Sequence, residues 1–393
     1  MKHAFILLLL SITALVAQDD DPSAPPPVNE LLIVVGAEGE EEYGQAFMDN
    51  LAQWKVAAAR GKAKAAVIDA YDENSLASIE TYFKESPKDL AVPLWVILIG
   101  HGTYNRRQAY FNLAGPDLSA EDLKEWLKPF KRPLIVVNTA SSSGAFLPIL
   151  SEKNRITVTA TKSGTEVNYA SFGNYMAAAL LNPETDFNND GESSVFEVFQ
   201  YAARQTAEYY EQEGRIQTET PLLDDNGDGR GTSLKDYDAI REGGTSKREP
   251  DGSFAKRWAL VLSPEEQAIP PEVRQRRNVL EAQIDNLRNR RHELEKEEYY
   301  AELEGLALQI ADLYTALEPE EENPVVETEQ VSAPEETDIE TPGELEPAKD
   351  AEDEQNDRET GSELVPAEGT DDKSKDETAT DSGNDEVGAP SGD

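Results

Sequence analysis

Few residues in this 393-residue chain could carry out nucleophilic chemistry. There is no cysteine, which excludes a thiol nucleophile, disulfides and cysteine-ligated zinc or iron–sulfur sites. Of the three histidines, only His101 lies in the predicted globular body, so a three-histidine zinc site is excluded too. His101 and Ser141 each follow a strongly apolar run, beside Gly102 and Ala140 respectively. Because a serine hydroxyl needs a base and an orienting group to attack, the candidate centre is a Ser141–His101 dyad, whose orienting acid the sequence does not identify.

A second kind of chemistry is indicated by residues 186–197, DFNNDGESSVFE, which have the spacing of an EF-hand calcium loop. Ca²⁺ prefers about six to eight hard oxygen ligands, and Gly191 stands where such a loop turns sharply. Ser193 replaces the aliphatic residue through which paired loops contact each other, so we expect a single site of modest affinity. The alternative is an Asn/Asp turn that caps the next helix. The expected ligands are Asp186, Asn188, Asp190, the carbonyl of Glu192, Ser194 and Glu197.

Residues 224–235 begin with the same pattern, because Asp224, Asn226 and Asp228 occupy the first three ligand positions. The last acidic position holds Lys235 instead. Two interpretations remain open for this segment. It is either a weak cation site or a Gly-rich polar loop at the rim of a binding groove.

Strand and helix patterns alternate through the middle of the chain. Continuous apolar runs predict buried parallel strands at 31–36, 64–71, 94–102, 133–139 and 155–161, with a last candidate at 258–262. Helical patterns occur at 41–60, 73–86, after Ser119, at 171–181 and at 195–213. The alternation predicts an α/β domain over 30–265 with a mainly parallel sheet. Sites in such sheets form beyond the carboxyl ends of the strands, which here are Gly100–Asn105 and Asn138–Ala145.

These two strand ends, ILIGHG and IVVNTASSSG, resemble those of the caspase-like peptidase clan, and most closely its legumain-like members. In that clan one strand ends in His-Gly and the next main strand ends in Ala-Cys. The corresponding residues here are His101-Gly102 and Ala140-Ser141. The resemblance extends over roughly residues 31–262. It implies a caspase/legumain-like three-layer sandwich, with the site at these two strand ends.

The catalytic residues of that family carry over to this sequence only in part, because His101 matches and three other positions do not. Ser141 replaces the cysteine nucleophile. Glu42 and Gly44 stand where legumains have an orienting Asn and an Arg that helps to read the substrate. These replacements favour a pseudopeptidase that keeps the scaffold and binds peptides or proteins. The alternative is an active serine-type hydrolase that uses Ser141 with His101.

The charge of the chain is concentrated at its end. The net charge is −42, and residues 319–393 alone contain 27 acidic and 4 basic residues. With no aromatic residue to bury, this acidic tail is predicted to be disordered. The other 318 residues are also net acidic, at −19, so the chain lacks the basic surface that a nucleic-acid-binding protein needs.

The N-terminus has the form of a secretory signal peptide over residues 1–17, because Lys2 and His3 precede an apolar run that ends at Ala17. Residues 18–29 have the composition of a Pro-rich linker. We therefore expect an exported protein, periplasmic or extracellular, with no membrane segment after cleavage.

Residues 270–318 are predicted to be helical, because two leucine-rich stripes run through them. The stripes are out of phase, which predicts a break or bend near Glu297–Gly305. A helical hairpin would satisfy the pattern, and so would a short coiled coil between two chains. In the second case residues 272–318 form the seam of a homo-oligomer, and the protein acts chiefly as a scaffold.

Overall fold

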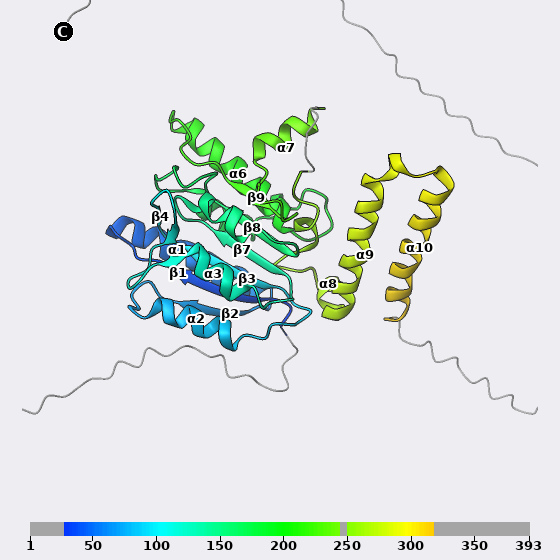
Figure 1. Ribbon diagram of the computed structural model, residues 1–393, viewed down its shortest axis with the longest axis horizontal. Coiled ribbons are helices and arrows are strands. Elements are labelled where there is room, and N and C mark those ends of the chain that lie inside the picture. Colours follow the sequence, from blue (N-terminus) through cyan, green and yellow to red (C-terminus); the bar gives the residue numbers. More distant parts are fainter. Residues whose placement is uncertain (1–26, 244–249, 318–393) are drawn as a thin grey trace, which may run out of the picture. The chain divides into compact units, whose positions relative to one another are not determined.

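The computed structural model describes residues 27–243 and 250–317 (Figure 1). The predicted signal peptide, most of the predicted linker and the acidic tail lie outside these residues. None of the helices described is long and apolar enough to cross a membrane.

A six-stranded sheet forms the centre of the domain, in the order β2-β1-β3-β7-β8-β9. The first five strands of that order run parallel, and β9 pairs with β8 antiparallel. The apolar runs form the central strands because these strands are covered on both faces, and β1, β3 and β7 are almost completely buried. The predicted α/β class with a mainly parallel sheet is therefore confirmed. The strands are β1 (Glu30–Val35), β2 (Lys64–Ile68), β3 (Leu94–Ile99), β7 (Leu134–Asn138), β8 (Arg155–Thr159) and β9 (Leu222–Asp224).

Helices cover both faces of the sheet, and each face has its own hydrophobic core (Figure 1). One core contains residues of α1 (Glu41–Arg60), α5 (Phe172–Ala179) and α6 (Val195–Gln212). The other contains residues of α2 (Ser75–Glu85), α3 (Ala120–Leu127) and α4 (Leu147–Leu150). Alternate residues of each central strand point to opposite cores, as the two-residue period of a strand requires. A further helix, α7 (Leu234–Arg241), contributes Tyr237 to the first core.

The predicted strand 94–102 is divided at Gly100 and His101. After β3 the chain enters a small antiparallel sheet of β4 (Gly102–Tyr104), β5 (Ala109–Phe111) and β6 (Leu118–Ser119). A Cβ atom on Gly100 would lie 3.0 Å from the Phe111 ring and 3.1 Å from the Cα of Gly36. Glycine at this position therefore lets the small sheet fold back onto the large one without displacing Phe111 or Gly36.

Residues 258–262 do not form the expected last strand, and the strand that ends the sheet next to β8 is β9. The segment makes a single isolated bridge, between Ser194 and Ala259. Its carbonyl groups bind elsewhere: the Trp258 oxygen accepts from the Val195 N–H at 2.7 Å, and the Asn29 side chain donates to the Leu260 oxygen at 3.2 Å. These contacts fix the segment beside the sheet without adding a strand to it.

The C-terminal helices are α8 (Pro264–Ala268), α9 (Pro271–Asn289) and α10 (Lys296–Thr315). α9 and α10 lie side by side as a hairpin. The break or bend predicted near Glu297–Gly305 is present but lies a few residues earlier, because the chain turns at 290–295 and Gly305 lies inside α10. Leu294 and Glu295 are extended, and α10 starts directly after them. Leu280 and Leu287 of α9 and Tyr299 of α10 are buried in this hairpin.

Candidate functional site

The carboxyl ends of β3 and β7 bring the predicted dyad residues to one edge of the sheet. The two strands are parallel neighbours, with Leu98 paired to Asn138. His101 and Ser141 each lie three residues beyond that pair, one after each strand. The strand order therefore places the two residues at adjacent strand ends, as the sequence predicts.

The Ser141 hydroxyl is held by the backbone of Gly102. Its Oγ accepts a hydrogen bond from the Gly102 N–H at 3.3 Å and donates one to the Gly102 carbonyl at 3.2 Å. Ser141 is only 4% exposed. A Cβ atom on Gly102 would lie 2.3 Å from the Ser141 carbonyl oxygen, so glycine is what permits this close approach. Within the described residues no hydrogen bond joins Ser141 to His101.

The His101 imidazole lies among aromatic rings. Its centroid is 4.9 Å from that of Tyr43, 5.1 Å from Phe47 and 6.3 Å from Tyr169. Burial lowers the pKa of His101, against the smaller opposing effects of a hydrogen bond to the Glu38 backbone and of the Glu40 charge. The ring is therefore neutral at neutral pH, when it can both donate and accept a hydrogen bond.

The three serines after Ala140 do not cap the following helix. Ser142 precedes a short 3₁₀ turn (Ser143–Ala145), but its side chain makes no capping bond, and its buried Oγ has no hydrogen-bond partner among the residues described. Ser142 has φ 56°, a left-handed conformation that is uncommon outside glycine. Ser143 Oγ accepts from the backbone N–H groups of Ala160 and Thr161, at 3.1 and 3.2 Å. The cluster thus fastens the end of β7 to the end of β8.

The positions that differ from the legumain pattern lie at the start of α1. Glu42 is exposed, whereas Gly44 is buried against Glu38. A Cβ atom on Gly44 would lie 2.3 Å from a Glu38 carboxylate oxygen. An arginine at position 44 would therefore require the Glu38 side chain to move away.

Two carboxylates that the sequence analysis did not single out hold the loop beside His101. Glu219 accepts from the N–H groups of Ser171 and Phe172, at 2.7 and 3.0 Å, and burial raises its pKa to about 7. Glu166 accepts from the N–H and hydroxyl of Thr220, both at 3.0 Å. These residues belong to no motif, and only the tertiary contacts identify them.

The loop 186–197 adopts a tight turn with the expected acidic residues pointing at its own backbone. Asp186 accepts from the N–H groups of Asp190 and Gly191, at 3.2 and 3.0 Å. Asp190 in turn accepts from the Glu192 N–H at 2.9 Å. Gly191 has φ 89°, as the sharp turn requires. Val195 then starts α6, so the predicted exit helix is confirmed.

The carboxylate of the last expected ligand, Glu197, already accepts hydrogen bonds as part of the N-terminal cap of α6. One of its oxygens accepts from the Ser194 N–H and hydroxyl, and the other from the N–H groups of Phe187 and Asn188. Within the described residues no three carboxylate or imidazole side chains are grouped closely enough to hold a metal ion. Cation binding in this loop would require Glu197 to exchange these donors for the cation, which is consistent with a modest affinity at most.

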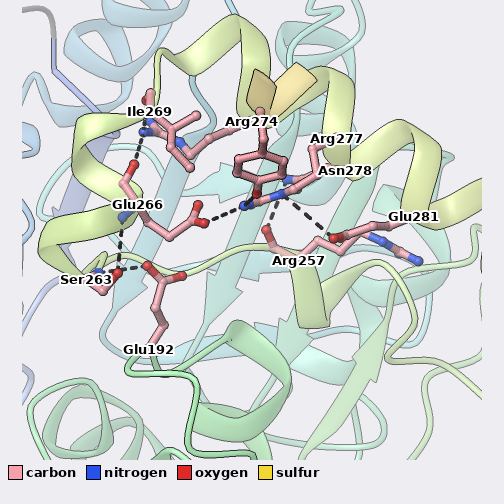
Figure 2. A network of polar contacts seen from close by, with 10 residues as sticks. Glu192, Arg257, Ser263, Glu266, Ile269, Arg274, Arg277, Asn278 and Glu281 are labelled. Atoms are coloured by element: carbon pink, nitrogen blue, oxygen red, sulfur yellow. Dashed lines mark hydrogen bonds and ion pairs between the residues drawn. The ribbon is translucent and has the colours of Figure 1, made fainter. Parts of the chain in front are cut away.

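Figure 2 shows how the seventh residue of this loop contacts the C-terminal helices. Glu192 Oε1 accepts from the Ser263 N–H at 2.7 Å. Nearby, Glu266 pairs with Arg277 at 2.5 Å, and Arg277 also donates to the Tyr314 hydroxyl at 3.0 Å. Burial raises the pKa of Glu192 to about 7, and the charge of Glu266 adds to the rise. The loop and the C-terminal helices therefore share one polar network.

In the second Asp-rich segment the side chains also bind local backbone. Asp224 Oδ1 accepts from the Gly227 N–H at 3.1 Å, and Asn226 Oδ1 from the Asp228 N–H at 2.9 Å. Asp224 is 1% exposed, and its other oxygen has no hydrogen-bond partner in the described part of the chain. The neighbouring Asp225 accepts from three N–H groups of residues 252–255. Both interpretations of this segment remain open.

The chain matches no protein-family model and no curated protein. What the site does must therefore be inferred from its own contacts. These are a neutral imidazole among aromatic rings, a serine hydroxyl held by backbone atoms, and an adjacent loop on which Val167 is 66% exposed.

Proposed function

We propose that this chain is an exported caspase/legumain-like pseudopeptidase that binds peptides or partner proteins at the ends of β3 and β7. The observation that carries the proposal is the position of Ser141 Oγ. Both hydrogen-bonding roles of this hydroxyl are filled by the backbone of Gly102, and none of its bonds reaches His101. A hydroxyl without a bonded base is a poor nucleophile at neutral pH.

The arrangement of the sheet supports a caspase-like three-layer sandwich. A hydrophobic core lies on each face, and the strand order ends in one antiparallel strand. The matching His-Gly and Ala-Ser dipeptides stand at the ends of adjacent parallel strands. The chain would therefore keep the peptidase fold although it lacks the cysteine nucleophile. A binding role at the ends of β3 and β7 is consistent with this combination.

Ligand binding is supported by the surface next to His101. Tyr43 and Tyr169 stack at 5.0 Å and are only partly buried, and Val167 is exposed on the same loop as Tyr169. Partly exposed aromatic rings provide large contact area at low entropic cost. Glutamates at positions 38 and 40–42 lie beside this cluster. We therefore expect ligands with a basic residue to bind best.

A binding experiment tests the proposal. Fluorescein-labelled peptides that differ only in a central Arg, Ala or Glu are titrated with the protein, and anisotropy is measured. The Arg peptide should bind most tightly, and Tyr169→Ala should weaken its binding by about tenfold or more. The control Tyr300→Ala, which removes a 48% exposed ring from the C-terminal hairpin, should leave the affinity unchanged. Absence of binding to all three peptides would contradict the proposal.

Calcium binding by residues 186–197 belongs to the same proposal. The loop supplies Asp186, Asn188 and Asp190 as side-chain ligands and Glu192 as a carbonyl ligand. Its supporting features are the sharp turn at Gly191 and the helix that follows. The cation would stabilise the fold and would take no part in chemistry at His101.

A further inference from the structure

The C-terminal hairpin exposes a larger share of the large apolar side chains than its share of the described residues. Five of the eleven exposed large apolar side chains in the described residues lie within 271–317. Leu308 on α10 is 58% exposed, and Tyr300 is 48% exposed. Tyr299 is the one buried residue of α10, a helix of 20 residues. A helix that buries so little of itself is stabilised poorly by the hairpin alone.

A groove runs between the two helices. Its volume is about 380 Å³, and its floor includes Leu287 of α9 with Gly305 and Leu306 of α10. Arg290 and Glu302 lie at 3.9 Å from each other on its walls. A groove of this size is large enough to receive side chains from another helix.

Gly305 lines this groove, and no contact within the chain accounts for a glycine at this position. It stands in the interior of α10, where glycine is the least favourable residue apart from proline. A Cβ atom there would meet no atom within 4 Å. Nothing within the hairpin therefore requires a glycine. A missing side chain at this position permits the close approach of another backbone.

The charges of the two helices have opposite signs. α10 contains five acidic residues and one lysine, whereas α9 and the turn after it expose Arg276, Arg288, Arg290 and Arg291. Glu298, Glu304 and Asp312 of α10 form no ion pair in the part of the chain that is described. The acidic tail has the same sign as α10, so it fits this surface poorly. A second hairpin carries the matching basic helix.

We propose that the occupant of this surface is a second copy of the same chain. In the two-fold symmetric assembly, α10 of each copy packs on α9 of the other, with Gly305 at the close approach and Leu308 covered. The glutamates of α10 then face the arginines of the partner's α9. This inference does not depend on the proposed peptide-binding role.

The test measures the mass of the chain that lacks its predicted signal peptide, by sedimentation velocity over a range of concentrations. The wild type should be a dimer that weakens as the salt concentration rises. Leu308→Glu and Gly305→Gln should each raise the dissociation constant by about tenfold or more. Gln is a better helix former than Gly, so Gly305→Gln should keep its helical circular dichroism while it loses the dimer.

A control separates this surface from general effects of added charge. Ile216, in the α/β domain, is 88% exposed, so Ile216→Glu introduces the same charge elsewhere and should leave the dimer intact. A wild type that is monomeric at every concentration would overturn the proposal. So would a dimer whose dissociation constant is the same in Leu308→Glu, Gly305→Gln and Ile216→Glu.

Discussion

The backbone of Gly102 determines the hydrogen bonding of the Ser141 hydroxyl. Because glycine leaves the backbone of β4 open, its N–H and carbonyl both reach the serine hydroxyl. The hydroxyl thus helps to join the ends of β7 and β4, a structural role that needs no base. His101 is meanwhile kept neutral by burial among Tyr43 and Phe47. The pair is adjacent in the fold but is not arranged as a donor and an acceptor.

Calcium binding is tested best at Asp190. Calorimetry of the wild type with Ca²⁺ should show binding of modest affinity, and Asp190→Ala should abolish it, because the loop loses a carboxylate ligand. Asp236→Ala, in the cap of α7, is a control for the loss of an acidic capping residue outside the loop. If the wild type gives neither heat nor a thermal shift with Ca²⁺, the loop is only a turn that caps α6.

Three carboxyls, of which Glu219 and Asp251 are buried and Glu192 is partly buried, predict an unusual pH dependence of stability. Burial raises the pKa of Glu192, Glu219 and Asp251 to about 7 in the folded protein. Their unfolded pKa values are lower, so the folded state binds more protons and gains stability as the pH falls from about 8 to about 5. The gain is complete below the unfolded values and is lost as the pH rises through about 7.

Glu219→Gln isolates one of these groups. Urea unfolding at pH 5 and pH 8 should show that the variant loses up to about 3 kcal/mol of the wild-type difference in the free energy of unfolding. Glu211→Gln, at an exposed position near the end of α6, should retain the full difference. A wild type that is more stable at pH 8 than at pH 5 would contradict the assignment.

At the scale of the elements, the core helix α1 packs on the sheet through a row of buried side chains, of which Trp54 is the largest. Trp54 is fully buried, and its ring lies 6.4 Å from that of Trp95 in β3. Trp54→Ala should therefore lower the free energy of unfolding by about 3–5 kcal/mol. Val56→Ala, at a 54% exposed position of the same helix, should change it by about 0.5 kcal/mol or less. Thermal or urea unfolding measures both, and equal effects would show that α1 is not held as described.

Much of this architecture could be predicted from the sequence. The continuous apolar runs indicate buried parallel strands, and the predicted helix at 41–60 agrees with α1 in both bounds. The Ser119 cap is also confirmed, because its Oγ accepts from the Asp122 N–H at 3.0 Å. These features are local, so their signals lie within short windows of sequence.

Other features depend on contacts between distant residues. β9 has only three residues, and its place at the edge of the sheet follows from its pairing with β8, which no local pattern reveals. The segment 258–262 has a strand-like composition, but Asn29 and Val195 bind its carbonyl groups. In the site, the strand ends are predictable, whereas the role of Glu219 and the engagement of Ser141 by Gly102 arise from tertiary packing.

At the scale of the whole described chain, Arg277 of α9 joins the three C-terminal helices to one another. It pairs with Glu266 of α8 and donates to Tyr314 of α10. Arg277→Ala should leave Glu266 without its partner and loosen α10, because a partly buried carboxylate loses its cation. Limited proteolysis should then cut α10 faster than in the wild type. Arg276→Ala removes the neighbouring exposed arginine and should change the rate little; equal rates for both variants would refute this role.

The central claim is that the scaffold of a peptidase remains here without its nucleophilic chemistry. Labelling with a serine-directed fluorophosphonate probe, in the presence and absence of Ca²⁺, tests it most directly. We predict no labelling of the wild type above the level of Ser141→Ala, because the hydroxyl is occupied by the Gly102 backbone. Labelling of the wild type that disappears in both Ser141→Ala and His101→Ala would contradict the claim and identify an active serine-type hydrolase.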